Sequence, residues 1–228
     1  MIRHVGIAGV MGLACLAMAL SWQTPWVYPL LVAAFPLMLF ISHDRADLVY
    51  YALGLTLGAG IDVAQSGTGV TVYAAPAQLL FLPLFVFFYW GLGLVAIRHL
   101  AALMPPVEFH VADGLVAVGA IGLSLFANQA PTGVAIAMLA LLALRLGWVR
   151  HRHDWSAALM GMLIGPGSES LLISHGLYAF PSAHGALVPL WLIALYGCIG
   201  VASRGLVAGM NRELMRLGRR MDPASSRD

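Results

Sequence analysis

Two stretches of the chain decide the fold, RADLVYYALGLTLGAGIDVAQSGTG at 45–69 and RHDWSAALMGMLIGPGSESLLISHG at 152–176. Each places about 20 mostly apolar residues after an Arg and an Asp, which is the length that a helix needs to cross the ~30 Å hydrocarbon core of a bilayer. Both stretches therefore predict transmembrane helices. They also resemble each other at a constant offset of 107 residues, and this likeness predicts an internal duplication.

The matches at this offset include scarce residue types as well as glycines. Asp47 aligns with Asp154, and Asp62 aligns with Glu169. The same offset pairs Gly54 with Gly161, Gly58 with Gly165 and Gly60 with Gly167. After one deleted residue the likeness continues and pairs Pro83 with Pro189, Gly91 with Gly197 and Arg98 with Arg204. An ordered set of this kind indicates a repeat. We expect a first repeat at 1–104, a second at 105–210 and a basic cytoplasmic tail at 211–228.

The composition indicates that lipid is the solvent of this protein. The chain has 228 residues, of which 61% are hydrophobic and 10% are charged, and its mean hydropathy is +0.87. A soluble globule could not cover so much apolar surface with polar groups. The net charge of +2 lies in a few loops and forms no basic face, so we expect no nucleic-acid partner. Cys15 and Cys198 both lie in apolar runs and are interpreted as packing residues.

Hydropathy places eight windows of near-spanning length along the chain, at 5–21, 26–42, 47–65, 78–97, 112–128, 133–149, 155–174 and 187–205. The predicted fold class is an all-α, polytopic transmembrane bundle of about eight helices in two parallel four-helix repeats. Because each repeat has an even number of spans, the halves should enter the membrane in the same direction and be related by an axis along the membrane normal.

Arginine alone supplies the basic residues, and all twelve fall on one side of the eight-helix arrangement. Loops rich in Arg stay in the cytoplasm, so both termini are predicted to be cytoplasmic in a bacterial inner membrane. The first window also resembles a signal peptide, with Ala17-Met18-Ala19 as a cleavage site. Gln23-Thr24-Pro25 after this window nevertheless matches Gln129-Ala130-Pro131 in mid-chain, which favours a retained first span.

Asp62 and Glu169 are the acidic residues that lie well inside predicted spans. Intramembrane carboxylates are costly and usually functional, so both are candidate catalytic residues; satisfaction by backbone donors or interfacial water is the structural alternative. Each follows a stripe of glycines spaced by four residues, which permits close helix packing. If the two stripes face each other across a pseudo-twofold axis, the acids converge on one pocket, and one of them keeps a proton beside an ionised partner.

A second group of candidates surrounds these acids. Gly165-Pro166-Gly167 predicts a break in the seventh span and a pocket beside it. The candidate substrate-binding residues are His175, Tyr178, His184 and Tyr73. A metal site formed by Glu169 with the two histidines is a weaker alternative because the spacing matches no metal motif, and the sequence contains no motif that implies a cofactor.

Part of each half resembles carotenoid-modifying membrane proteins, the small membrane lycopene cyclases and the carotenoid hydratases. The likeness lies in Asp62, Thr68-Gly69-Val70, Tyr73 and Pro83-Leu84. The second half repeats it with Glu169, His175-Gly176-Leu177-Tyr178 and Pro189-Leu190. The resemblance implies protonation of an isoprenoid double bond by Asp62 or Glu169. The cyclases carry acids just after the proline, whereas this chain has Phe85-Val86 and Trp191-Leu192. Uncharacterised bacterial membrane proteins show a similar layout.

These observations favour an intramembrane enzyme or binding protein that acts on an apolar lipid, an isoprenoid or acyl chain, by carboxyl acid/base chemistry. The alternative functions are a carrier or channel for a small solute or ion, which would use the same carboxylates, and a membrane scaffold protein. The bilayer and an apolar lipid ligand are the expected partners. The oligomeric state is left open by the sequence.

Overall fold

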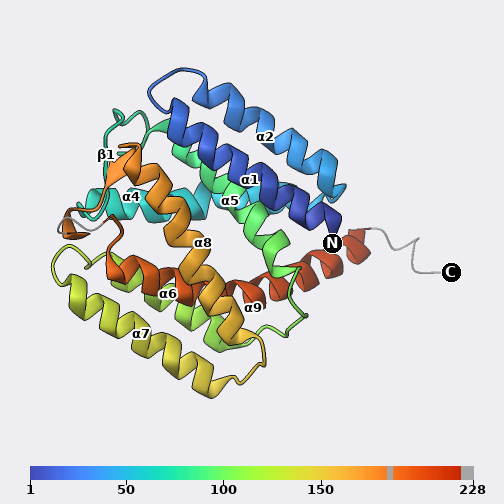
Figure 1. Cartoon of the computed structure of the whole chain (residues 1–228). Helices are drawn as coiled ribbons and strands as arrows, with labels where there is room; N and C mark the ends of the chain where they lie inside the picture. The colour runs from blue at the N-terminus through green and yellow to red at the C-terminus, as the bar shows by residue number, and fades with distance from the viewer. Residues whose placement is uncertain (184–186, 222–228) are drawn as a thin grey trace.

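The structure, a computed structural model, describes residues 1–183 and 187–221, with side chains to 217. Its elements (Figure 1) are α1 (Ile2–Ser21), α2 (Val27–Ser42), α3 (Ala46–Leu53), the π-helical η1 (Gly54–Gly58), α4 (Ala59–Gly67), β1 (Val72–Tyr73), α5 (Leu84–Ala101), α6 (Val111–Ser124), α7 (Pro131–Trp148), α8 (Asp154–Ser174), β2 (Tyr178–Ala179), the 3-10 helix η2 (Pro181–Ala183) and α9 (Leu190–Met221).

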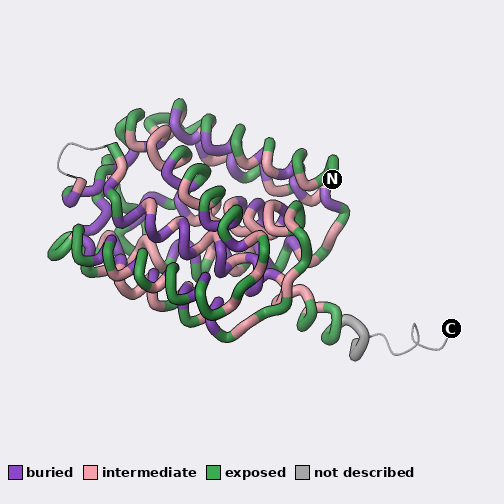
Figure 2. The backbone as a smooth tube through the Cα atoms, turned by 60° about the horizontal axis from the view of Figure 1, so that its bottom comes forward, coloured by how far each residue is buried: buried purple, intermediate pink, exposed green. Residues whose placement is uncertain are grey.

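The fold is the predicted all-helical membrane bundle. Six helical segments of the described chain are long and apolar enough to cross a membrane, with α3, η1 and α4 counting as one segment, and α2 and α6 are shorter apolar helices. Together they correspond to the eight predicted windows. Exposed residues follow the outer faces of the helices, and buried residues face the interior of the bundle (Figure 2). The protein is a multi-pass membrane protein.

Two helix boundaries differ from the predicted windows. The fourth helix begins at Leu84 instead of 78, because the preceding segment contains an isolated bridge and positive φ angles at Leu80 and Phe81. The last helix continues to Met221, so residues 211–221 of the predicted tail are part of α9. A hydropathy window ends where charged residues begin, but a helix does not have to end there. Arg, Glu, Leu and Met have high helix propensity, so the helix continues through them.

The predicted break at Gly165-Pro166-Gly167 is wrong, because α8 is continuous from Asp154 to Ser174 with Pro166 inside it. A proline removes one backbone hydrogen bond, and neighbouring helices make this loss tolerable in membrane helices. The irregular turn lies instead in the third span, where Gly54–Gly58 forms the π-helical η1 one turn before Asp62. Such turns often occur at functional sites.

The packing divides into two similar groups. α5 packs against α1, α2 and the α3–η1 segment, while α9 packs against α6, α7 and α8. The contacts between the groups also recur. Trp22 Nε1 donates to the carbonyl oxygen of His175 at 3.0 Å, and Asn128 Nδ2 donates to that of Gly69 at 2.7 Å. The residues of these two contacts are offset by 106 positions, one fewer than the offset of 107. The antiparallel pairing of β1 with β2 joins the two halves. The duplication itself stays a prediction.

Ion pairs hold the helices together at one end of the bundle, which we call the arginine end after Arg98, Arg145 and Arg204. Arg98 binds Asp44 and Asp47. The corresponding Arg204 binds Asp154 at 2.7 Å, and Arg145 bridges Asp154 and Asp113. We call the opposite end, where Tyr73 and Tyr178 lie on β1 and β2, the tyrosine end. That the arginine end faces the cytoplasm stays a prediction.

Candidate functional site

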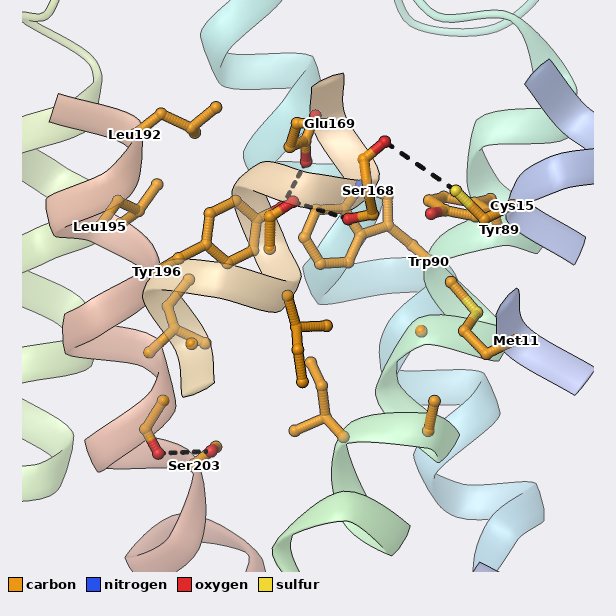
Figure 3. A pocket seen from close by; sticks show the side chains of 18 of the residues that line it. Met11, Cys15, Tyr89, Trp90, Ser168, Glu169, Leu192, Leu195, Tyr196 and Ser203 are labelled. Carbon is orange, nitrogen blue, oxygen red and sulfur yellow. Dashed lines mark hydrogen bonds between the residues drawn. The ribbon is translucent and has the colours of Figure 1, made fainter. Parts of the chain in front are cut away.

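A cavity of about 400 Å³ lies between the two halves of the bundle. Its wall is formed by side chains of α1, α4, α5, α8 and α9, with β1 and β2 closing the tyrosine end. In Figure 3 the cavity extends from Glu169 and Tyr196 at one end to Ser203 at the other, with Met11 and Cys15 of α1 along one wall. Most of its lining is apolar, and its size lies within the range of ~300–1,000 Å³ that is typical of ligand pockets.

Asp62 lies in this wall on α4 and is held by two donors. Its Oδ2 atom accepts hydrogen bonds from Tyr73 Oη at 2.7 Å and from Trp90 Nε1 at 2.8 Å. Tyr73 comes from β1 and Trp90 from α5, so three elements fix the position of this carboxyl group. An indole N–H can only donate, which leaves Asp62 as the acceptor in that contact.

Glu169 lies in the wall of the same cavity on α8. Its Oε1 atom accepts a hydrogen bond from the hydroxyl group of Tyr196 on α9. Asp62 and Glu169 are thus held in the same way: each carboxyl group accepts a hydrogen bond from an aromatic side chain on the last helix of its own half. Trp90 and Tyr196 occupy equivalent positions when the halves are aligned after the deleted residue.

The glycine stripes explain how these aromatic donors come so close. A Cβ atom at Gly58 would lie 2.6 Å from the Trp90 ring, and one at Gly165 would collide with the Tyr196 ring. The expectation that the two stripes face each other is wrong, because each stripe faces the last helix of its own half, α5 or α9. The carboxyls nevertheless share one cavity because they lie beyond the stripes, where α4 and α8 border it.

Of the four predicted substrate-binding residues, the structure brings two into the cavity. Tyr73 and Tyr178 both line it, with ring centroids 5.2 Å apart. His175 is exposed at the end of α8, outside the lining, and its Nδ1 contacts the carbonyl oxygen of Leu171 at 2.8 Å. His184 lies outside the described residues. No group of three or more His, Cys, Asp or Glu is placed to hold a metal ion within the chain that the structure describes.

Sequence reasoning missed Trp90, Tyr196 and Tyr89, which all line the cavity. In the sequence, Trp90 ends the aromatic run FFYW at 87–90, which is typical of a lipid-facing belt. The sequence contained a more specific signal for these two residues, because Trp90 and Tyr196 immediately precede the aligned glycines Gly91 and Gly197. Two aromatic donors at equivalent sites, beside glycines that admit close neighbours, indicate partners for the two acids.

Comparisons with known proteins agree on the class of protein and leave its activity open. The model of DUF2878, described as a protein of unknown function, matches residues 123–218. No curated protein matches the sequence. Among solved structures, a mycobacterial Insig homolog, MvINS from Mycobacterium vanbaalenii, is similar with a TM-score of 0.60 at 21% identity, over 72% of this chain and 93% of that one.

The chain has an Insig-like fold. A second structure of MvINS, a cross-linked trimer, matches over 73% of this chain and 94% of that chain, again with a TM-score of 0.60 and 21% identity. The similarity to MvINS and to the family of unknown function supports the predicted layout of a polytopic membrane protein. Neither comparison names a carotenoid-modifying protein, so the resemblance to that class gains no support from them.

Proposed function

We propose that the protein is an intramembrane enzyme or binding protein for a long apolar lipid, an isoprenoid or acyl chain, with Asp62 and Glu169 as its acid/base groups. One observation carries this proposal: carboxyl groups from equivalent positions of the two halves line a single apolar cavity of about 400 Å³. Carboxyls are expensive inside a membrane and are retained there for function. A predominantly apolar pocket with a few convergent polar groups is the usual form of a small-molecule site.

The cavity is placed to receive a ligand from the bilayer. Gly12 of α1 and Met160 and Ile164 of α8 all line it and are also exposed, Ile164 by 49%. In this structure without a membrane, exposure on these helices corresponds to contact with lipid tails. The pocket therefore borders the bilayer between α1 and α8, and an apolar chain can enter sideways without passing through water.

The two carboxyls supply acid/base chemistry as a pair. Two negative charges in one poorly solvated site repel each other, so one of the two groups keeps its proton while the other is ionised. Asp62 accepts two hydrogen bonds and Glu169 accepts one. Hydrogen bonds stabilise a carboxylate, so the ionised form is favoured more at Asp62 than at Glu169. In the proposed reaction Glu169 gives a proton to one carbon of an isoprenoid double bond, and Asp62 removes a proton from the carbon next to the cationic centre.

Lipid extraction and mass spectrometry of the purified protein test the binding step. We expect one lipid class at about one molecule per chain in the wild type and its loss in Gly93→Phe, because Gly93 lines the cavity and a Cβ atom there would come no closer than 3.7 Å, to Met11 Cε. Gly147→Phe is the matched control, since a Cβ atom there meets nothing within 4 Å and Gly147 lies outside the cavity lining. Equal lipid content in all three proteins would contradict the proposal.

A solute or ion carrier is the second candidate, and the length of the cavity favours this function. The lining extends from Tyr73 at the tyrosine end to Arg204 at the arginine end, which is most of the depth of the bundle. Carriers place ionisable groups along such a path. Flux of protons or small cations into proteoliposomes that is abolished by Asp62→Asn, together with a protein that carries no stoichiometric lipid, would replace the lipid proposal with this one.

A further inference from the structure

The polar groups of the cavity are distributed unequally between its two ends. Asp62 and Glu169 lie toward the tyrosine end, where the hydroxyl group of Tyr73 binds Asp62 and Tyr178 also lines the cavity. The lining, all of which the structure describes, contains a single cationic side chain, Arg204, at the arginine end. A ligand in this cavity therefore meets hydrogen-bond acceptors at one end and a guanidinium group at the other.

The acids retain capacity to accept further hydrogen bonds. All contacts found for them use Asp62 Oδ2 and Glu169 Oε1. Among the described residues none donates to Asp62 Oδ1 or to Glu169 Oε2, and neither of these oxygens is among the buried atoms that lack a partner. A carboxylate accepts at both oxygens, so ionised Asp62 offers its free Oδ1 to a donor on a ligand, while the free Oε2 of Glu169 carries the proton that the proposed reaction uses.

The charge of Arg204 is already balanced. Its Nη1 atom binds Asp154 at 2.7 Å, and Asp154 is shared with Arg145, which also binds Asp113. Two cations and two anions thus form a neutral buried cluster, in which only the Arg204 Nε–H lacks a partner. The cavity has no uncompensated positive charge to attract an anionic head group, whereas the carboxyls at the other end repel one.

We propose that the ligand is a single-chain lipid whose head group donates hydrogen bonds, a primary alcohol or a protonated amine, and that the site discriminates against a carboxylate or phosphate on the same chain. This inference rests on the proposed lipid function and names the class of head group. The alcohol or ammonium group donates to the free oxygen of Asp62 at the tyrosine end, the carbons next to the head group lie beside Glu169, and the chain extends toward Arg204.

The length of the cavity sets the length of the chain. Ala157 and Glu169 both line it from α8, and twelve residues of helix separate them, or about 18 Å at a rise of ~1.5 Å per residue. An extended fourteen-carbon chain is of comparable length. Ile97, Met160 and Ile199 are among the apolar lining residues between the acids and Arg204, so a saturated chain needs no polar partner along most of its course.

Competition binding with three probes of one chain length tests this assignment. Radiolabelled 1-tetradecanol is bound to the full chain in detergent at pH 8, and unlabelled 1-tetradecanol, tetradecylamine and myristate compete for it. We expect the alcohol and the amine to compete at least tenfold more strongly than myristate. In the double variant Asp62→Asn, Glu169→Gln, this preference should fall to less than threefold, because the repulsion of the carboxylate is removed. Glu108→Gln, an exposed acid outside the cavity, should retain the preference.

The outcomes separate the two proposals. Equal competition by all three probes, or stronger competition by myristate, overturns the head-group assignment and leaves lipid binding in place. A preference that survives in the double variant also overturns it, because the acids then do not select the head group. Failure of every probe to bind saturably overturns the head-group assignment, and lipid extraction of the wild-type protein, which does not depend on these probes, decides whether the lipid proposal falls with it.

Discussion

Replacing Gly54 by Ala tests the close packing that positions the site. A Cβ atom at residue 54 would lie 2.7 Å from Gly91 Cα and 2.8 Å from the carbonyl carbon of Trp90. Both are backbone atoms of α5, so the helices must separate. Overpacking of this kind costs about 1–3 kcal/mol, and the contact with rigid backbone places Gly54→Ala at the upper end. The better helix propensity of Ala returns at most ~1 kcal/mol, which leaves a net loss of about 2 kcal/mol.

Gly60→Ala is the matched control on the same span, because a Cβ atom there meets nothing within 4 Å. This variant gains helix propensity without a clash, so it should be stabilised by up to ~1 kcal/mol. In thermal unfolding followed by tryptophan fluorescence, a shift of about 2–4 °C per kcal/mol predicts a melting temperature for Gly54→Ala roughly 6–12 °C below that of Gly60→Ala. If the two variants melt together, the reasoning from close helix approach is refuted.

The remaining predictions concern topology, the ion pairs and acid. Reporter fusions at Arg98 should be cytoplasmic and those at Ser182 periplasmic; a cytoplasmic result at Ser182 would contradict the eight-span topology. Asp154→Asn should cost about 3–5 kcal/mol in unfolding experiments because it leaves two buried arginines without their shared carboxylate. Glu213→Gln, in an exposed pair, should cost less than ~1 kcal/mol. Burial tends to raise the pKa of Asp44, but hydrogen bonds from Arg98 and a backbone N–H outweigh burial and lower that pKa. The stability that Asp44 contributes is therefore present above about pH 4 and lost as the pH falls below it, so the difference in melting temperature between wild type and Asp44→Asn should close in acid.

Hydropathy was sufficient for the membrane bundle because the requirement for about 20 apolar residues is imposed by the bilayer and acts on each helix separately. It failed where tertiary context decides. Pro166 does not break α8, since its neighbours tolerate one missing hydrogen bond. The π-helical turn at Gly54–Gly58 has no counterpart in α8, although both segments carry the same glycine spacing.

The candidate site was predictable in part. Asp62 and Glu169 were found because a carboxyl inside a span is rare, and the structure places both in one cavity. Their donors Trp90 and Tyr196 were missed because aromatic residues in a membrane helix usually indicate an interface. Predicting which helix each glycine stripe faces would have required knowing which helices pack against each other. Spacing along one helix defines a face but does not identify its neighbour.

An experimental density map of the protein purified in lipid nanodiscs tests the central claim most directly, because it shows what fills the cavity between the two halves. The account predicts elongated density along the cavity wall, with its polar end within hydrogen-bonding distance of Asp62 and Glu169. A cavity that contains only water, or one in which the two carboxyl groups are separated by packed side chains, would contradict the account.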